Sequence, residues 1–188
     1  MTIADFFKTY YNKQVEYDGV AYYQCVDYLK VYLNKHLGIK PGSWGNAKEY
    51  GLQADNPKWA GYGIMHKYCD WIPGHIPPER GDIVIFNGTY GHVGIADGDS
   101  NTKGFYIYEQ NWNSKKYVQR NRHFYTDMLG VWRPKWNVVV TDLNIRSMAS
   151  SNSEIIGLYH KGELVQIIGK KYGWKQTHKG WCFDKYLD

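Results

Sequence analysis

The chain has 188 residues, which is enough for one ordinary domain or two small ones. Hydrophobic residues make up 43% and charged residues 22%, so a buried core is expected, and no apolar stretch is long enough to predict a transmembrane helix or membrane insertion. The net charge of +5 comes from scattered basic residues and does not indicate nucleic-acid binding. The first residues contain no basic segment followed by an apolar run, so no secretory signal peptide is predicted.

The first predicted element is an amphipathic helix over residues 25–37. Gly38 is a natural stop for this helix, and Pro41 cannot continue it. Its apolar residues recur at helical spacing and share one face: Val26, Leu29, Leu33 and Leu37.

Three strands are predicted after the helix. Residues 80–86 form a turn that enters a buried strand, and residues 92–96 follow a glycine-rich turn as its antiparallel partner. Residues 105–112 form the next strand. Because side chains alternate along a strand, Phe105, Ile107, Glu109 and Asn111 are expected on one face.

The composition changes near residue 134, where a mixed helix and strand pattern gives way to short strands alone. We place the domain boundary at Pro134–Asn137, which gives domains of residues 1–134 and 138–188. About 50 residues of short strands separated by turns are typical of a small β-barrel. The expected strands are residues 138–141, 163–168, 174–177 and 181–183.

The chain has three cysteines, Cys25, Cys69 and Cys182. An odd number without a C-x-x-C motif indicates neither a disulfide framework nor a zinc ribbon. Cys25 falls at the start of the predicted helix, where free N–H groups and the helix dipole favour a nucleophilic thiolate. A lone cysteine is usually a packing residue, so this position does not define a nucleophile by itself.

His92 is the natural candidate for a general base. It begins a predicted strand, and Gly91 and Gly94 leave its surroundings open, as a cleft requires. The remaining histidines lack this glycine-flanked strand context: His36, His66, His75, His123, His160 and His178.

Glu109 and Asn111 supply a third element for the same chemistry. On one face of a strand, both side chains could reach one imidazole, fix its tautomer and stabilise the imidazolium. They could instead be solvated polar residues, but Phe105 and Ile107 mark that face as packed. A polar group on a packed face needs a partner.

The sequence resembles the CHAP family of cysteine- and histidine-dependent amidohydrolases and peptidases, a papain-like group that cuts peptidoglycan. The resemblance covers roughly residues 12 to 133 and implies an α+β, papain-like catalytic domain. It lies in four motifs, which occur in this order: Tyr23–Asp27, Arg80–Asp82, Gly91–Gly94 and Tyr108–Trp112.

The resemblance also implies roles for individual residues. Cys25 would be the nucleophile, His92 the general base and Glu109 the residue that orients His92. Asn111 would complete a quartet, and Gln24 would help line the oxyanion pocket.

Residues 138–188 resemble bacterial SH3-type wall-binding domains, which implies a small all-β SH3-like barrel. The sequence departs from that pattern at Met148-Ala149, where Gly-Pro is usual. We expect Cys182 to be structural and Cys69, which matches no motif, to be buried. The resemblance lies in short fragments: Leu143–Ser147, Ile156–Gly157, Lys161–Gly162, Gly173–Trp174, Gly180–Trp181 and Tyr186–Leu187.

An acidic segment before the predicted helix is a candidate calcium site, and some family members resemble it and bind calcium there. Alternating oxygen donors with a turn glycine, Gly19, suit a hard cation. An ordinary acidic turn is the alternative, and Glu16 stands where calcium-binding relatives more often have Asp. The candidate ligands are the carboxylates of Glu16, Asp18 and Asp27 and the backbone carbonyls of Val20 and Tyr22.

Together these features predict a modular peptidoglycan hydrolase of the endolysin type, acting at the bacterial cell wall through a cysteine thioester and without an organic cofactor. The bond that is cut stays open between an N-acetylmuramoyl-L-alanine amidase and an endopeptidase. Two alternatives belong to other classes: a catalytically inactive wall-binding protein and a thioester acyl-transferase. The complete quartet argues against the first, and product analysis would separate the second.

Overall fold

The computed structural model describes all 188 residues, and the chain divides into two units. Phe6–Pro134 forms the larger unit, and Lys135–Asp188 together with Met1–Asp5 forms the smaller unit. The grouping of the first five residues differs from the predicted first domain, which included them. A hydrogen bond explains it, because the backbone N–H of Ile3 donates to the carboxylate of Asp188 at 2.9 Å.

The α-helices occupy the first 68 residues. None is both long and apolar enough to cross a bilayer. Their bounds are α1 (Ile3–Tyr10), α2 (Cys25–Lys35), α3 (Glu49–Leu52) and α4 (Tyr62–Tyr68).

The predicted helix is α2, and it ends at Lys35, two residues earlier than expected. Gly38 follows in the left-handed region with φ of 67°, which ends the helical path. Leu29, Leu33 and Leu37 are buried, as the periodicity predicts. The packed surface of α2 is wider than this stripe, because Tyr28 and Tyr32 are also buried and contact Phe6 of α1.

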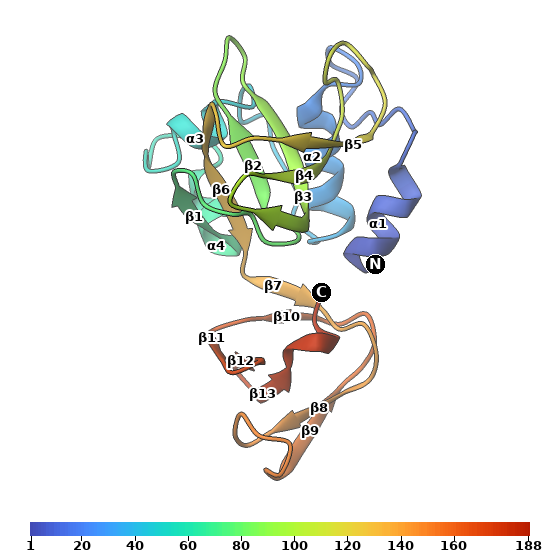
Figure 1. Cartoon of the computed structure of the whole chain (residues 1–188), viewed down its shortest axis with the longest axis vertical. Helices are drawn as coiled ribbons and strands as arrows, with labels where there is room; N and C mark the ends of the chain where they lie inside the picture. The colour runs from blue at the N-terminus through green and yellow to red at the C-terminus, as the bar shows by residue number, and fades with distance from the viewer. The chain divides into compact units, whose positions relative to one another are not determined.

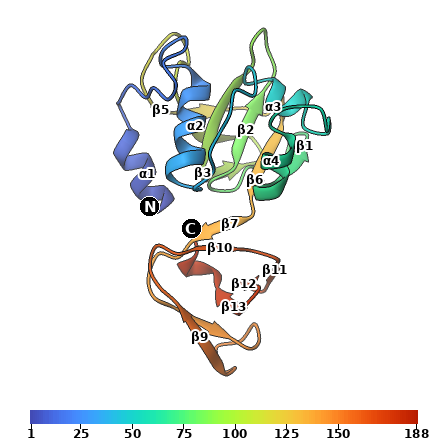
Figure 2. The ribbon, with the colours of Figure 1, turned by 180° about the vertical axis from the view of Figure 1, so that it is seen from behind.

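The larger unit contains one antiparallel sheet of six strands, and α2 lies along one face of it, next to β3 (Figures 1 and 2). The strand order is β1-β6-β2-β3-β4-β5. Buried apolar side chains of β2, β3, β4 and β6 form the core of the sheet. The bounds are β1 (Cys69–Pro73), β2 (Ile83–Phe86), β3 (His92–Asn101), β4 (Gly104–Glu109), β5 (Gln119–His123) and β6 (Met128–Pro134).

The paired strands predicted at residues 80–86 and 92–96 correspond to β2 and β3, which pair as an antiparallel hairpin. The strand predicted to continue to residue 112 ends at Glu109 instead. Asn111 adopts a left-handed conformation with φ of 61°, so the chain turns there and leaves the sheet. This turn changes where the Asn111 side chain points.

The smaller unit is all-β, with a two-stranded sheet of β10 and β7 and a five-stranded sheet in the order β11-β12-β13-β8-β9. The predicted strand 174–177 matches β12, whereas the strand predicted at 138–141 is wrong: β7 ends at Val138, and Val139 makes only an isolated bridge to Leu187. The bounds are β7 (Trp136–Val138), β8 (Leu143–Arg146), β9 (Ile155–Tyr159), β10 (Leu164–Gln166), β11 (Gly169–Lys171), β12 (Trp174–Thr177) and β13 (Gly180–Phe183). The predicted fold class, an α+β domain followed by a small all-β domain, is confirmed.

Candidate active site

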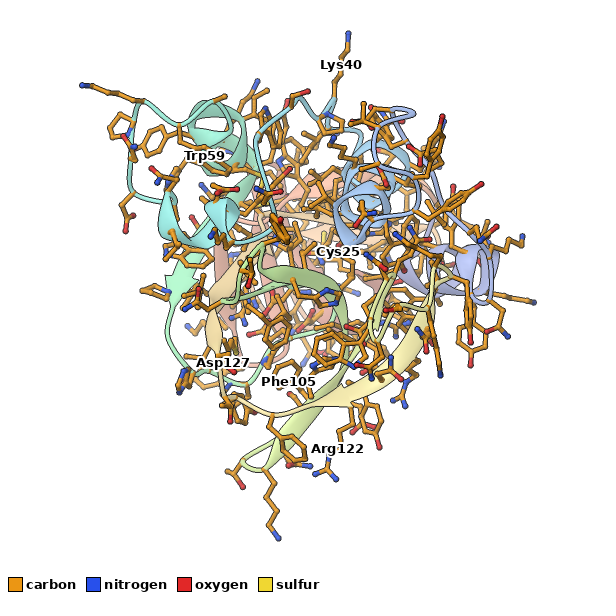
Figure 3. The ribbon with its side chains drawn as sticks, turned by 90° about the horizontal axis from the view of Figure 1, so that it is seen from above. Cys25, Lys40, Trp59, Phe105, Arg122 and Asp127 are labelled. Carbon is orange, nitrogen blue, oxygen red and sulfur yellow. The ribbon has the colours of Figure 1, made fainter.

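Cys25 is the first residue of α2 and lies near the middle of the view in Figure 3. A hydrogen bond caps the start of the helix: the backbone N–H of Gln24, the residue before Cys25, donates to the carboxylate of Asp27 in the first turn at 2.7 Å. Cys25 lines a cleft of about 470 Å³ that His92 and Asn111 also line. The N-terminal turn of α2 therefore presents the thiol to a cleft, where its free N–H groups favour negative charge.

His92 begins β3 and is buried beside Cys25. Its Nε2 lies 2.6 Å from Oε2 of Glu109, and the Cys25 side chain is its second hydrogen-bond partner. Because Nε2 contacts the carboxylate, Nδ1 is the nitrogen left for the thiol. Burial lowers the pKa of His92, but the hydrogen bonds and charges of Cys25 and Glu109 outweigh it and raise the pKa to about 9. His92 is therefore protonated at neutral pH.

Glu109 is fully buried at the end of β4, and both of its oxygens accept hydrogen bonds. Oε2 faces His92, while Oε1 accepts from His123 Nε2 at 2.8 Å and from Asn121 Nδ2 at 2.8 Å. Burial raises the pKa of this carboxyl, but the hydrogen bonds from His123 and His92 outweigh it and hold the pKa below its usual value. The imidazole of His92 thus faces an ionised carboxylate.

Asn121 and His123 were not among the residues predicted from the sequence. They occupy alternate positions of β5, whose pairing with β4 puts them on the same side of the sheet as Glu109. The sequence offers no alternation that would single them out, because all five residues of β5 are polar.

Asn111 does not share a strand face with Glu109, so the prediction that both reach one imidazole from that face is wrong. Because the chain turns after β4, Nδ2 of Asn111 donates instead to Oε1 of Gln24 at 2.8 Å. The turn is held by the buried side chain of Gln110, which accepts from the backbone N–H of Val15 at 2.7 Å and donates to the carbonyl of Gln24 at 3.0 Å. Asn111 therefore contacts the residue before the nucleophile.

Gln24 was expected to help line an oxyanion pocket. Its side chain lines the cleft, but its Nε2 donates to the backbone carbonyls of Ala21 at 2.5 Å and Tyr22 at 3.2 Å. Its amide hydrogens are thus occupied in this conformation.

The predicted calcium ligands converge in part. The carboxylates of Glu16, Asp18 and Asp27 place ligand atoms within 4.8 Å of one another. Burial and then the negative charges of Glu16 and Asp18 raise the pKa of Asp27, although the N–H of Gln24 opposes this. The repulsion among these carboxylates and their oxygen donors fit a hard cation.

Two features of the same cluster compete with a cation. Lys30 Nζ lies 2.5 Å from Asp18 Oδ2 and already supplies one positive charge. Oε1 of Glu16 accepts three backbone N–H bonds, from residues 17, 18 and 19. The other two predicted ligands are the backbone carbonyls of Val20 and Tyr22. The carbonyl of Tyr22 accepts hydrogen bonds from the side chains of Gln24 and Lys116, and Val20 lines the cleft.

The other two cysteines are fully buried, as expected for Cys69, and neither forms a disulfide. Burial raises the pKa of Cys182 to about 11, which keeps it a neutral thiol. Cys25 is the cysteine that lines the cleft.

Two curated relatives are phage endolysins. Endolysin LysK of Staphylococcus phage K is 34% identical over 118 residues, which is 59% of this chain and 22% of LysK. Endolysin PlyTW of Staphylococcus phage Twort (strain DSM 17442 / HER 48) is 28% identical over 143 residues, which is 70% of this chain and 29% of PlyTW. The chain therefore matches less than a third of the length of these relatives.

Two solved structures share the fold. The wild type endolysin LysIME-EF1 aligns with a TM-score of 0.56 at 23% identity, over 94% of this chain and 78% of that one. Ly7917 aligns with a TM-score of 0.51 at 18% identity, over 100% of this chain and 97% of that one. The CHAP domain model matches residues 15–111, just over half of the chain, and these residues include Cys25, His92 and Glu109. The chain therefore belongs to the CHAP domain family.

Proposed function

We propose that this chain is a peptidoglycan hydrolase that cleaves an amide bond of bacterial cell-wall peptide through a cysteine thioester. The observation that carries the proposal is the alignment of Cys25, His92 and Glu109 at the cleft, with His92 between the thiol and a buried carboxylate. Membership of the family and the endolysin relatives support the wall as the site of action. A nucleophile, a base and an orienting carboxylate are the parts that acyl transfer from an amide requires.

The first half of the reaction forms an acyl-enzyme. The thiolate of Cys25 attacks the amide carbonyl, which gives a tetrahedral oxyanion with a new C–S bond. The oxyanion collapses, the C–N bond breaks, and the imidazolium of His92 donates its proton to the leaving amine. A thioester on Cys25 remains.

The second half releases the product. Neutral His92 accepts a proton from water, and the hydroxide attacks the thioester carbonyl. The C–S bond then breaks to give a carboxylic acid and the Cys25 thiolate, while His92 keeps the proton taken from water, so the starting ion pair is restored. Glu109 stabilises the imidazolium in both halves and keeps Nδ1 directed at Cys25.

The oxyanion would lie beside the start of α2, because the first backbone N–H groups of a helix have no partner within the helix and can donate to it. Gln24 can contribute a side-chain N–H if it exchanges its bond to the Ala21 carbonyl for the oxyanion. Asn111 holds the other end of the Gln24 amide and would limit its rotation.

The cleaved bond distinguishes an N-acetylmuramoyl-L-alanine amidase from an endopeptidase. Mass spectrometry of muropeptides after digestion of purified peptidoglycan decides between them. Free N-acetylmuramic acid ends with intact stem peptides indicate the amidase, and new peptide termini indicate the endopeptidase. New cross-links would instead indicate an acyl-transferase, and unchanged peptidoglycan would leave an inactive wall-binding protein.

We also propose that the smaller unit is an SH3-type domain that binds the wall. It contains a groove of about 810 Å³ with three aromatic residues in its lining, Trp174, Phe183 and Tyr186. Such rings suit amphipathic peptide or glycan surfaces. In the full chain, Trp174→Ala should reduce co-sedimentation with purified walls, while exposed Tyr172→Ala, outside that lining, should not.

The acidic cluster is proposed as a calcium site, with Glu16, Asp18 and Asp27 as the carboxylate ligands. The ion would offset their mutual repulsion beside the nucleophile. Asp27 belongs to the first turn of α2, so an occupied site would also stabilise the start of that helix.

A further inference from the structure

His123 is a buried histidine that the proposed reaction does not use directly. It is the last residue of β5, is 6% exposed, and contacts Oε1 of Glu109 through Nε2 at 2.8 Å. Arg122, the residue before it, points away from the body of the unit in Figure 3. The alternation of β5 therefore turns Asn121 and His123 inward together.

Glu109 is the negatively charged neighbour of His123, and aromatic rings surround the rest of the imidazole. Its ring centroid lies 4.6 Å from that of Trp112, 5.1 Å from Phe86 and 6.5 Å from Phe105. The ring of His92, which contacts the other oxygen of Glu109, is stacked with the ring of His123, and their centroids are 6.4 Å apart. Three of these rings are uncharged hydrocarbon or indole, so the hydrogen bond to Glu109 is the polar contact that satisfies His123 Nε2.

We propose that His123 is a positioning residue of the active site, which donates its Nε2 hydrogen to Oε1 of Glu109 and thereby holds Oε2 on His92. The inference rests on the proposed function, because it assigns His123 to the same reaction. A carboxylate has two oxygens that exchange by rotation about one bond. With Oε1 held by His123 and Asn121, that rotation is blocked and Oε2 keeps its 2.6 Å contact with His92.

The donor from His123 also stabilises the ionised form of Glu109. Burial alone would raise the pKa of this carboxyl, and the hydrogen bonds from His123 and His92 lower it. Without His123, protonation of Glu109 therefore begins at a higher pH. Because protonated Glu109 no longer stabilises the His92 imidazolium, the acid limb of the activity profile should move upward.

The test compares two substitutions across a pH series. His123→Phe keeps a ring for packing but removes the donor, whereas His123→Gln keeps an N–H near the position of Nε2. We expect the acid limb of wall lysis to rise by about one pH unit in His123→Phe and to stay near the wild-type position in His123→Gln. His36→Phe, which removes another buried histidine far from Glu109 in sequence, should leave the limb in place even if the melting temperature falls.

A second readout needs no wall substrate. Iodoacetamide should alkylate Cys25 selectively, because Cys69 and Cys182 are fully buried. At mildly acidic pH the alkylation rate should fall several-fold in His123→Phe and recover in His123→Gln. If the wild-type protein does not cleave peptidoglycan, the proposed function fails, and this profile still decides the role of His123.

The proposal is overturned if a folded His123→Phe protein shows unshifted lysis and alkylation profiles, or if His123→Gln shifts them as much as His123→Phe. If His123→Phe does not fold, the side-chain ¹⁵N spectrum of the wild-type histidines decides. A hydrogen on Nε2 of His123 throughout the active pH range supports the proposal, and an unprotonated Nε2 contradicts it.

Discussion

Two clusters of polar groups lie beside the start of α2: the single carboxylate of Glu109 with its donors, and the three carboxylates around Asp27. They differ in how the negative charge is balanced. Glu109 is fully buried, yet the hydrogen bonds it accepts from His123 and His92 lower its pKa against the effect of burial. Asp27 is also buried, but burial and the neighbouring charges of Glu16 and Asp18 raise its pKa. Burial thus acts in the same direction on both groups, and their neighbours decide the outcome.

The hydrogen bonds around Glu109 balance its negative charge, whereas the acidic cluster around Asp27 keeps a net negative charge that a cation could neutralise. Around Glu109, three donors from β3 and β5 satisfy the two oxygens, so the carboxylate needs no further ligand. Around Asp27, three acidic groups share one lysine, Lys30, and repel one another. The first cluster should govern the chemistry, and the second should govern stability and its dependence on cations.

The largest effect is expected at the nucleophile that the first cluster serves. Cys25→Ala removes the covalent route, so the rate of peptidoglycan cleavage should fall at least about 10³-fold. Cys69→Ala is the matched control, because it removes a buried cysteine outside the cleft and should spare the chemistry. A Cys25→Ala protein that keeps more than about a tenth of the rate, a loss under ~1.4 kcal/mol of barrier, would show that the nucleophile is misassigned.

The two carboxylates themselves provide the next contrast. Glu109→Gln should reduce turnover by about 10²-fold with the fold intact, because the imidazolium loses its charged partner. In excess chelator, Asp27→Asn should change turnover less than tenfold relative to wild type, since an amide oxygen can still accept from the Gln24 N–H. Steady-state rates on soluble muropeptides measure both. Equal losses in the two variants would remove the distinction between the clusters.

The dependence of stability on pH should follow His92. Its pKa is raised from 6.5 to about 9 on folding, so its contribution is fully present below the unfolded pKa and is lost as the pH rises through about 9. At about 1.4 kcal/mol for each pKa unit, the free energy of unfolding should decline by up to about 3 kcal/mol over this window. Urea titrations of wild type and His92→Phe at pH 6 and pH 10 measure this, and the variant should lack most of the decline.

The smallest effect is expected at the acidic cluster. A chelator should lower the melting temperature by a few degrees and slow lysis, and added calcium should restore both where magnesium does so poorly. Asp18→Asn should blunt the response to calcium. An unchanged melting curve in excess chelator, with no metal bound to the purified protein, would leave an acidic turn paired with Lys30.

The sequence was sufficient to predict the positions of Cys25 and His92 at the start of a helix and a strand, and of Glu109 on a packed strand face, because each depends on local spacing. Their roles in catalysis stay predictions. The sequence was insufficient for His123 and Asn121, because their approach to Glu109 depends on the register between β4 and β5. That register is fixed by pairing across a loop and leaves no periodic signal in either strand.

Asn111 shows a different limit. Alternation correctly put Phe105, Ile107 and Glu109 on one packed face, but it was extended two residues beyond the end of the strand. The left-handed conformation of Asn111 and the buried bonds of Gln110 end the alternation there. Asparagine is among the residues that adopt this conformation readily, so the turn was visible only as a propensity.

In the smaller unit, turn residues and Gly-Trp pairs marked the ends of β12 and β13 correctly. The strands β8 and β9 were matched only as family fragments and were not predicted as strands. Exposed Ile155, Ile156 and Leu158 break the expected inside–outside alternation in β9. Pattern alone therefore gave no reason to place a strand there.

The thioester is the central claim, and trapping it is the most direct test. Wild-type protein mixed with soluble muropeptides should be quenched in acid within the first turnovers, digested with pepsin and examined by mass spectrometry. The proposed reaction predicts a peptide containing Cys25 that carries the acyl part of the substrate, accumulating further in Glu109→Gln if hydrolysis of the thioester slows. Cleavage of the substrate with no adduct on Cys25, and at an undiminished rate in Cys25→Ala, would contradict it.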